Sequence, residues 1–262
     1  MHSPLKDPRT RYPGQSLSEQ LRDVREDQLS ELIVPFLCVT LIGFSWWYHF
    51  QPGKPNPVAI TVVALIASVW SIWRIVAIGK HKANLRKGLI GEQILGKFLE
   101  EQLMPHKYQV IHDLLCKNGE RAFNIDHVVI GPTGVFSIET KYWKKPAGPD
   151  HKIFYDGKRI LVDGRVPDRD PLIQAVAGAR SVQAILEART GKRFDVKPIV
   201  VFLGWYTTGN PGSAPAWVLN EQAVPTFIKN DFRELSHDDG LLAIAQLKQY
   251  SAECGKEAGS LG

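Results

Sequence analysis

The segment from residue 123 to residue 143, FNIDHVVIGPTGVFSIETKYW, holds the residues best placed to do chemistry. Two strand-like runs flank the sequence Gly-Pro-Thr-Gly at 131–134, which is typical of a tight hairpin turn. With Pro and Thr at the tip, Asp126 is predicted to lie directly opposite Glu139 on one face of the sheet. Because side chains alternate along a strand, Lys141 shares that face. The opposite face is predicted to carry an apolar set, namely Ile125, Val129, Phe136 and Ile138.

Two opposed carboxylates repel each other, so the Asp126–Glu139 pair needs a positive charge nearby. Lys141 provides part of that charge, and a divalent cation would provide more. Mg²⁺ favours one or two protein carboxylates, with water and phosphate oxygens in its other positions. Such an ion lowers the pKa of a bound water, and Lys141 would orient that water or stabilise charge on the phosphate. The alternative is a surface ion network; the opposed Asp and the apolar reverse face favour the metal site.

Glu92 and Gln174 extend this candidate site. Glu92 falls on the leucine stripe of a helix predicted for residues 84–103, where a lone carboxylate is costly. It is a candidate third acidic group at the metal, and a capped or salt-bridged structural Glu is the alternative. Gln174 lies on a small polar face of a helix predicted for residues 171–189. It could contact the site or be an ordinary surface glutamine.

The predicted elements run in the order helix, strands, hairpin, helix and strand, which indicates a mixed α/β fold. Beyond the helix at 84–103, strands are predicted at 108–116, 123–130, 135–143, 153–155, 159–162, 198–205 and 216–219. Asp170 and Pro171 form a good N-cap and first-turn pair for the second helix. A further helix is predicted near residues 239–252.

Four short motifs in this order resemble the nuclease-related domain (NERD) family, part of the wider PD-(D/E)xK nuclease-like group. They are Gly91-Glu92, Ile125-Asp126-His127, Glu139-Thr140-Lys141 and Pro171-Leu-Ile-Gln174. The resemblance covers roughly residues 84–205. It implies a restriction-endonuclease-like mixed sheet flanked by helices, and hydrolysis of phosphodiester bonds with Mg²⁺ or Mn²⁺. It also implies that Asp126, Glu139 and Glu92 bind the metal, and that Lys141 and Gln174 complete the catalytic set.

Two apolar runs precede this domain. Residues 32–50 contain no charged residue, and residues 58–78 contain only Arg74. At 1.5 Å per residue, each helix would reach about 28–32 Å, enough to cross a hydrocarbon core of about 30 Å. The proline-rich link between them predicts a tight turn. Basic residues gather at 80–87 and not in the link, so both termini are expected in the cytoplasm.

The sequence therefore predicts two transmembrane helices followed by an α/β domain. The expected boundaries are a polar, amphipathic N-terminal segment at 1–31, a membrane hairpin at 32–79, a nuclease-like domain at 80–235, and a C-terminal helix and tail at 236–262. The expected partners are nucleic acid, DNA or RNA, and the lipid bilayer. The rival hypothesis is a non-catalytic module of the same fold that binds nucleic acid or a partner protein at the membrane.

The composition adds little to the functional argument. Three scattered cysteines among 262 residues indicate neither a disulfide framework nor a zinc site. The net charge of +5 comes from the residues flanking the apolar runs, because residues 88–262 hold 21 basic and 21 acidic side chains. The basic excess therefore indicates membrane topology and anionic lipid contact, and it does not support nucleic-acid binding by the domain.

Overall fold

The structure of the protein is a computed structural model. This structure describes residues 11–50, 56–118, 121–148, 151–167, 170–212 and 214–259. The chain separates into two compact units, one formed by Leu17–Lys87 and the other by Met1–Ser16 together with Gly88–Gly262. The larger unit thus combines a short N-terminal segment with the C-terminal two thirds of the sequence. The domain boundary expected near residue 80 remains a prediction.

The smaller unit is built from parts of two long helices, α1 (Gln15–His49) and α2 (Val58–Leu103). Within it, Trp46 Nε1 donates to Thr61 Oγ1 at 3.0 Å near the connecting link, and Arg74 pairs with Glu31 at 2.8 Å towards the opposite end. Both helices are long and apolar enough to cross a membrane, a criterion that signal sequences and buried core helices also meet. They extend well beyond the predicted apolar runs, and α1 continues through Pro35.

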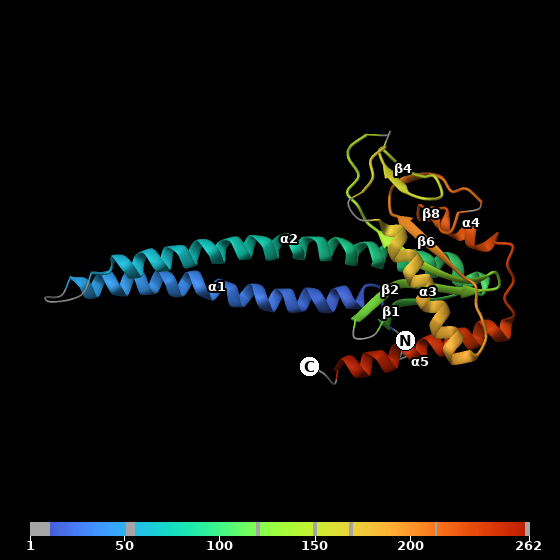
Figure 1. The fold of residues 1–262 in the computed structure, drawn as a ribbon, viewed down its shortest axis with the longest axis horizontal. Coiled ribbons are helices and arrows are strands. Elements are labelled where there is room, and N and C mark those ends of the chain that lie inside the picture. Colours follow the sequence, from blue (N-terminus) through green and yellow to red (C-terminus); the bar gives the residue numbers. More distant parts are fainter. Residues whose placement is uncertain are drawn as a thin grey trace, which may run out of the picture. The chain divides into compact units, whose positions relative to one another are not determined.

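The larger unit contains a mixed five-stranded sheet in the order β1-β2-β3-β6-β8 (Figure 1). Strands β1 to β3 are antiparallel neighbours, whereas β6 runs parallel to β3 and β8 parallel to β6. The bounds are β1 Gln109–Asn118, β2 Arg121–Gly131, β3 Gly134–Lys141, β6 Val196–Phe202 and β8 Trp217–Leu219. The predicted α/β class with a mixed sheet flanked by helices is confirmed.

A second, three-stranded sheet has the order β5-β4-β7. Its strands are β4 Lys152–Tyr155, β5 Ile160–Val162 and β7 Tyr206–Gly209. The remaining helices are the 3-10 helix η1 Met104–His106, α3 Pro171–Thr190, α4 Val224–Lys229 and α5 His237–Gly259. The sequence did not predict β7 or α4, each of which is short.

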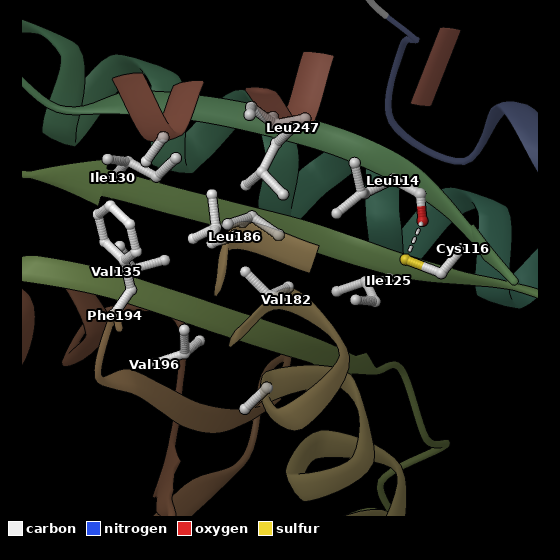
Figure 2. Close-up of a cluster of buried hydrophobic side chains, with 14 residues drawn as sticks. Leu114, Cys116, Ile125, Ile130, Val135, Val182, Leu186, Phe194, Val196 and Leu247 are labelled. Carbon is white, nitrogen blue, oxygen red and sulfur yellow. Dashed lines mark hydrogen bonds between the residues drawn. The ribbon is translucent and has the colours of Figure 1, made fainter. Parts of the chain in front are cut away.

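Helices cover both faces of the main sheet. On one face α3 packs on β3 and β6, and α5 packs on β1 (Figure 1). Figure 2 shows the buried side chains between them, among which Leu114, Ile130, Val182, Leu186 and Leu247 are completely enclosed. On the other face, Leu95, Leu99 and Leu103 of α2 pack with Val224 and Ile228 of α4 against the sheet. The sheet is therefore apolar on both sides, as expected for the centre of an α/β domain.

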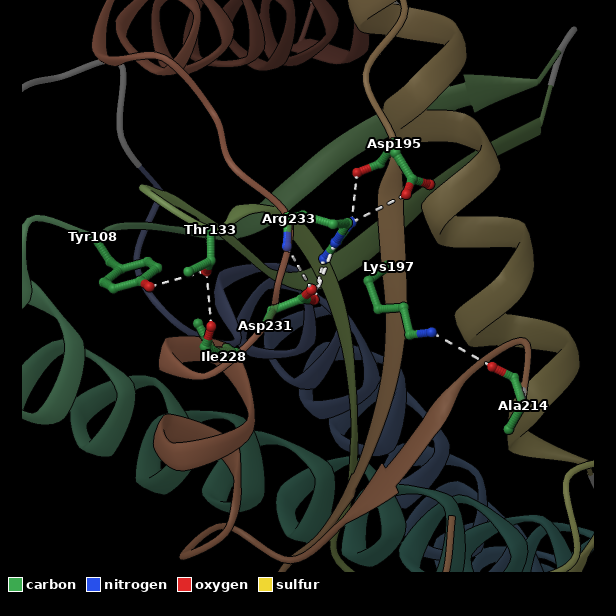
Figure 3. Close-up of polar contacts among 8 residues, drawn as sticks. All are labelled: Tyr108, Thr133, Asp195, Lys197, Ala214, Ile228, Asp231 and Arg233. Carbon is green, nitrogen blue, oxygen red and sulfur yellow. Dashed lines mark hydrogen bonds and ion pairs between the residues drawn. The ribbon is translucent and has the colours of Figure 1, made fainter. Parts of the chain in front are cut away.

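The loop after α4 is fixed by Arg233, which contacts Asp231 and Asp195 (Figure 3). Its guanidinium carbon lies 4.8 Å from the centre of the Phe136 ring. Arg233 Nη2 donates to Asp231 at 2.8 Å, and Nη1 donates to the carbonyl oxygen of Asp195 at 2.9 Å. Gly134, at the start of β3, has a φ of 129°, which favours glycine, and it lies in contact range of Arg233. The start of β3 is thereby joined to the start of β6.

Leu186→Ala should destabilise the larger unit by about 2–5 kcal/mol, because it removes a completely buried side chain and leaves a cavity beneath the sheet. Thermal unfolding of the full chain in detergent measures this loss. Ile173→Ala on the same helix is the control, since Ile173 is 70% exposed and should change stability little. Equal unfolding temperatures for the two variants would contradict the placement of Leu186 in the core.

Candidate active site

The β2–β3 hairpin brings the predicted carboxylates and lysine together. The two strands pair from Gly131 with Gly134 to His127 with Ile138, which is the register predicted from the sequence. Beyond that point Asp126 Oδ2 accepts a hydrogen bond from the Thr140 backbone N–H at 2.7 Å. The Asp126 carboxylate thus bonds to the β3 backbone where the ladder between the two strands ends. It is thereby held next to the Glu139–Lys141 segment.

Lys141 links three of the predicted residues. Its Nζ donates to Glu139 Oε1 at 2.6 Å and to Gln174 Oε1 of α3 at 2.8 Å. The side chains of Lys141 and Glu139 are only 17% and 15% exposed, so their ion pair is stronger than a typical surface pair. Gln174 therefore contacts the candidate site through Lys141. Asp170, as predicted, caps α3 by accepting from the Leu172 N–H at 2.9 Å, which fixes the first turn before Gln174.

Glu92 reaches the same region from α2. It is only 6% exposed, and its Oε2 has no hydrogen-bond partner among the described residues. Burial, followed by the negative charges of Asp113 and Glu139, raises the pKa of Glu92 to about 8, although Lys141 and a backbone hydrogen bond from Gly14 act in the opposite direction. A carboxyl group with one oxygen atom that lacks a donor in the described part of the chain is therefore held near two further acidic groups.

Asp126 is also a carboxyl group whose pKa is raised by burial and by neighbouring negative charges. Burial, the charge of Glu139 and the charge of Glu92 raise its pKa well above the usual range, against the opposing effects of the Thr140 hydrogen bond and Lys141. The negative charges of Glu139 and Glu92 thus act on Asp126, and Lys141 is the cation that counteracts them. Carboxyl groups whose pKa is raised in this way within a polar cluster are typical of functional sites.

The acidic side chains of the candidate site carry oxygen atoms of the type that Mg²⁺ binds. Among the described residues, no three His, Cys, Asp or Glu side chains are gathered as a ready-made metal site. Mg²⁺ does not require one, because it commonly takes one or two carboxylates and keeps several waters. Asp126 and Glu139 are oxygen donors of the right type, and the Glu92 Oε2 atom lacks any competing donor. The residues present therefore fit Mg²⁺ as a partly hydrated ion.

One side chain of the hairpin differs from expectation. Val129, Phe136 and Ile138 lie in the cluster beneath α2, as predicted, but Ile125 lies in the cluster beneath α3 and α5. The alternation is interrupted near Asp126, opposite a residue of β1, Asp113, that has a φ of 47°. A strict alternation of side chains along the strand does not predict this local irregularity. It lies at the point where the Asp126 side chain bonds to the backbone of β3.

His127 is a histidine of the core. It is completely buried, and its Nδ1 lies 2.9 Å from His112 Nδ1 on the paired strand. Burial, assisted by His112, lowers the pKa of His127 well below its usual range, so the imidazole is neutral at pH 7. His112 Nε2 in turn lies 3.0 Å from Glu100 Oε1. His127 therefore belongs to a buried polar chain on the α2 side of the sheet.

Sequence reasoning missed Asp113 and the N-terminal residues that bind it. The Asp113 side chain is completely buried and accepts hydrogen bonds from Arg11 Nε, the Ser16 N–H and the Ser16 hydroxyl. Helix α1 begins at Gln15, and the hydroxyl group of Ser16, in its first turn, donates to Asp113. The only available signal was an acidic residue within a strand-like segment.

The class that these features define is an α/β domain with a buried cluster of two glutamates, an aspartate and a lysine at the end of a hairpin. Residues 87–203 match the model of the nuclease-related domain (NERD) family. This match confirms the resemblance for that segment, which carries every candidate site residue. No curated protein and no solved structure compared with the chain matches it.

Glu92→Gln should alter how stability depends on pH. The folded chain retains the Glu92 proton up to a pKa of about 8, whereas the unfolded chain releases it near 4.5, so this group's contribution is present below pH 4.5 and lost as pH rises through 8. In chelator, the variant should match the wild type near pH 5 and exceed its stability at pH 8 by a few kcal/mol.

Denaturant unfolding of the full chain between pH 5 and 8.5 measures the difference. Glu101→Gln is the matched control, because the Glu101 side chain lies on the same helix and is 59% exposed. Its curve should follow the wild type throughout. A constant offset between Glu92→Gln and the wild type at every pH would show that Glu92 is not held protonated.

Proposed function

We propose that the larger unit is a divalent-metal-dependent nuclease of the PD-(D/E)xK type with a restriction-endonuclease-like fold. The observation that carries this proposal is the cluster around Lys141, in which Glu139 and Gln174 both accept from Nζ while the charges of Glu139 and Glu92 act on the buried Asp126. The match of residues 87–203 to the nuclease-related domain supports the same class. The substrate class is nucleic acid, either DNA or RNA.

Each residue has a proposed role. Asp126 and Glu139, with Glu92, would hold Mg²⁺ or Mn²⁺, and the ion when bound would polarise the phosphoryl group and acidify a water. Lys141 has three N–H donors, of which Glu139 and Gln174 accept two. The third would orient the attacking water or donate to a phosphate oxygen as negative charge develops. Gln174 fixes the direction of the ammonium group, and the Thr140 N–H fixes the Asp126 carboxylate.

Lys141→Ala and Asp126→Asn should each lower the rate of Mg²⁺-dependent cleavage by about 100-fold or more, since each removes a charge from the reacting centre. Asparagine keeps an acceptor for the Thr140 N–H, so the loss reports charge and not the hydrogen bond. The assay uses the full chain in detergent with single- and double-stranded DNA and RNA. It is repeated with Mn²⁺ and with chelator.

The matched control is Lys97→Ala, because the Lys97 side chain is 79% exposed on α2. It should cleave at the wild-type rate. If the wild type and both site variants were equally inert on all substrates, the nuclease assignment would fail. The rival hypothesis, a non-catalytic module at the membrane, would then be favoured, in agreement with the zero net charge of residues 88–262.

We also propose that the smaller unit is a two-pass membrane anchor with both termini in the cytoplasm. Large apolar side chains along both helices point into solvent in the isolated chain; those at least 66% exposed include Phe36, Val39, Val63, Ile66, Val69 and Trp73. Lipid would cover this surface, which is far larger than a soluble helix pair exposes. The basic residues at 80–87 and the near-absence of charge in the link support the orientation.

Cysteine labelling tests the topology in a variant whose three native cysteines are replaced by alanine. A membrane-impermeant maleimide should label Asn56→Cys, at the link, in intact cells. It should label Ala245→Cys, on the exposed side of α5, only after permeabilisation. The reverse pattern would invert the orientation, and labelling of both sites in intact cells or recovery of the chain in the soluble fraction would refute the anchor.

A further inference from the structure

The N-terminal segment at residues 11–16, called the strap below, is built into the larger unit. Its anchor is Asp113, which is 0% exposed and accepts from Arg11 and twice from Ser16 on one oxygen, Oδ2. The other oxygen, Oδ1, accepts from Asn124 Nδ2 at 2.8 Å. Removing the strap would leave Asp113 as a buried carboxylate with neither its cation nor two of its neutral donors. The strap is therefore held at both ends by one residue of β1.

Between these two anchors the strap lies along one stripe of α2. Leu89, Glu92 and Gly96 are spaced three and four residues apart, so they share one side of that helix. A Cβ at Gly96 would lie 2.6 Å from Pro13 Cγ, so the missing side chain makes room for the proline ring. A Cβ at Gly96 would also lie 3.3 Å from His112 Cε1 of β1, so the missing side chain brings α2 close to the sheet as well as to the strap.

Gly14 is the residue of the strap that lies against Glu92. Its φ is 73°, and a Cβ there would lie 2.5 Å from Leu89 Cδ1 and 3.5 Å from Glu92 Oε2. The Gly14 backbone is thus close to the Glu92 carboxyl group, and it acts to lower the pKa of Glu92. The position therefore requires glycine both for its backbone conformation and for its close approach to α2. Gly14 closes over Glu92 and is the part of the strap that touches a candidate site residue.

We propose that the strap is a positioning element of the active site, in which Asp113, through Arg11 and Ser16, holds Gly14 against Glu92 and so directs the Glu92 carboxylate towards Asp126 and Glu139. This inference rests on the proposed function of that cluster. It adds residues 11–16 and Asp113 to a site otherwise built from residues 92–174. None of these residues touches the reacting groups; they act through Glu92. Partners that orient a ligand in this way typically change metal affinity by 10–100-fold.

Gly14→Ala tests the proposal without altering any charged residue. The added methyl group lifts the strap from Leu89 and Glu92, so the dissociation constant for Mn²⁺ should rise by about 10-fold. Mn²⁺ binding to the full chain in detergent is followed by the electron paramagnetic resonance signal of the free ion. Hydrogen exchange of the amides at residues 14–16 is measured on the same samples and should become faster. Neither measurement depends on catalysis.

Gly164→Ala is the matched control, because Gly164 has a similar φ of 78° but has no atom within 4 Å of its Cβ position. It imposes the same backbone strain and should leave Mn²⁺ affinity and strap exchange unchanged. The double variant Gly14→Ala/Leu89→Ala removes the side chain that clashes and should restore part of the affinity. That rescue would separate lost positioning from general unfolding.

The outcomes are distinguishable. Faster strap exchange with weaker Mn²⁺ binding, rescued in the double variant, supports the proposal. Mn²⁺ affinity equal to that of the wild type in Gly14→Ala overturns the positioning role while leaving the metal site intact. Absence of Mn²⁺ binding by the wild type itself overturns the proposed function, and the positioning role with it.

Discussion

The removal of carboxylates from water is the constraint on which the larger unit depends. Asp113, Asp126 and Glu92 are all less than 10% exposed, and burying an ionised carboxylate is costly unless donors surround it. The three are compensated to different degrees. Asp113 accepts hydrogen bonds on both oxygens, one of them from a cation. Asp126 has its bond from the Thr140 N–H, and one oxygen of Glu92 has no donor among the described residues. Asp113, whose two oxygen atoms are both hydrogen-bonded, attaches residues 11–16 to β1. Asp126 and Glu92, which have fewer donors, lie where a cation would be favourable.

Local periodicity made the hairpin side of the site predictable. A turn sequence fixes the register of two strands, so the pairs from Gly131–Gly134 to His127–Ile138 followed directly, and Asp126 bonds to the β3 backbone at Thr140 where this pairing ends. The Asp170 cap of α3 was predictable for the same reason, because it depends on residues within one turn. Short elements such as β7 and α4 were missed, since four to six residues carry too little periodic signal. Ile125 was placed on the wrong face because an irregularity in a neighbouring strand reverses the alternation.

The contacts that sequence reasoning could not reach are those made between distant segments. Ser16 and Asp113 are separated by 97 positions, and neither belongs to a recognisable motif. Pro13 and Gly14 look like ordinary turn residues in a polar leader, and only the close approach of α2 explains why they fit there. Glu92 was identifiable as an anomaly on an apolar stripe, but its neighbours were not. A pattern in one segment shows that a charge needs a partner, whereas the fold determines which partner it obtains.

Two backbone connections join the two units, and both lie close in sequence to Glu92 or to Gly14, which lies against it. The chain passes from the larger unit to the smaller one after Ser16 and returns at Gly88. Ser16 is hydrogen-bonded to Asp113, and Gly88 lies about one helical turn before Glu92 on α2. Both covalent links between the units therefore enter the larger unit within a few residues of the groups that hold Glu92. A displacement carried along the backbone from the apolar helices would reach Gly14 and Glu92 before it reached the hairpin that carries Asp126, Glu139 and Lys141. Glu92 is thus the acidic residue of the cluster that lies nearest in sequence to the smaller unit, whereas the hairpin residues are held by the sheet and by Gln174 of α3.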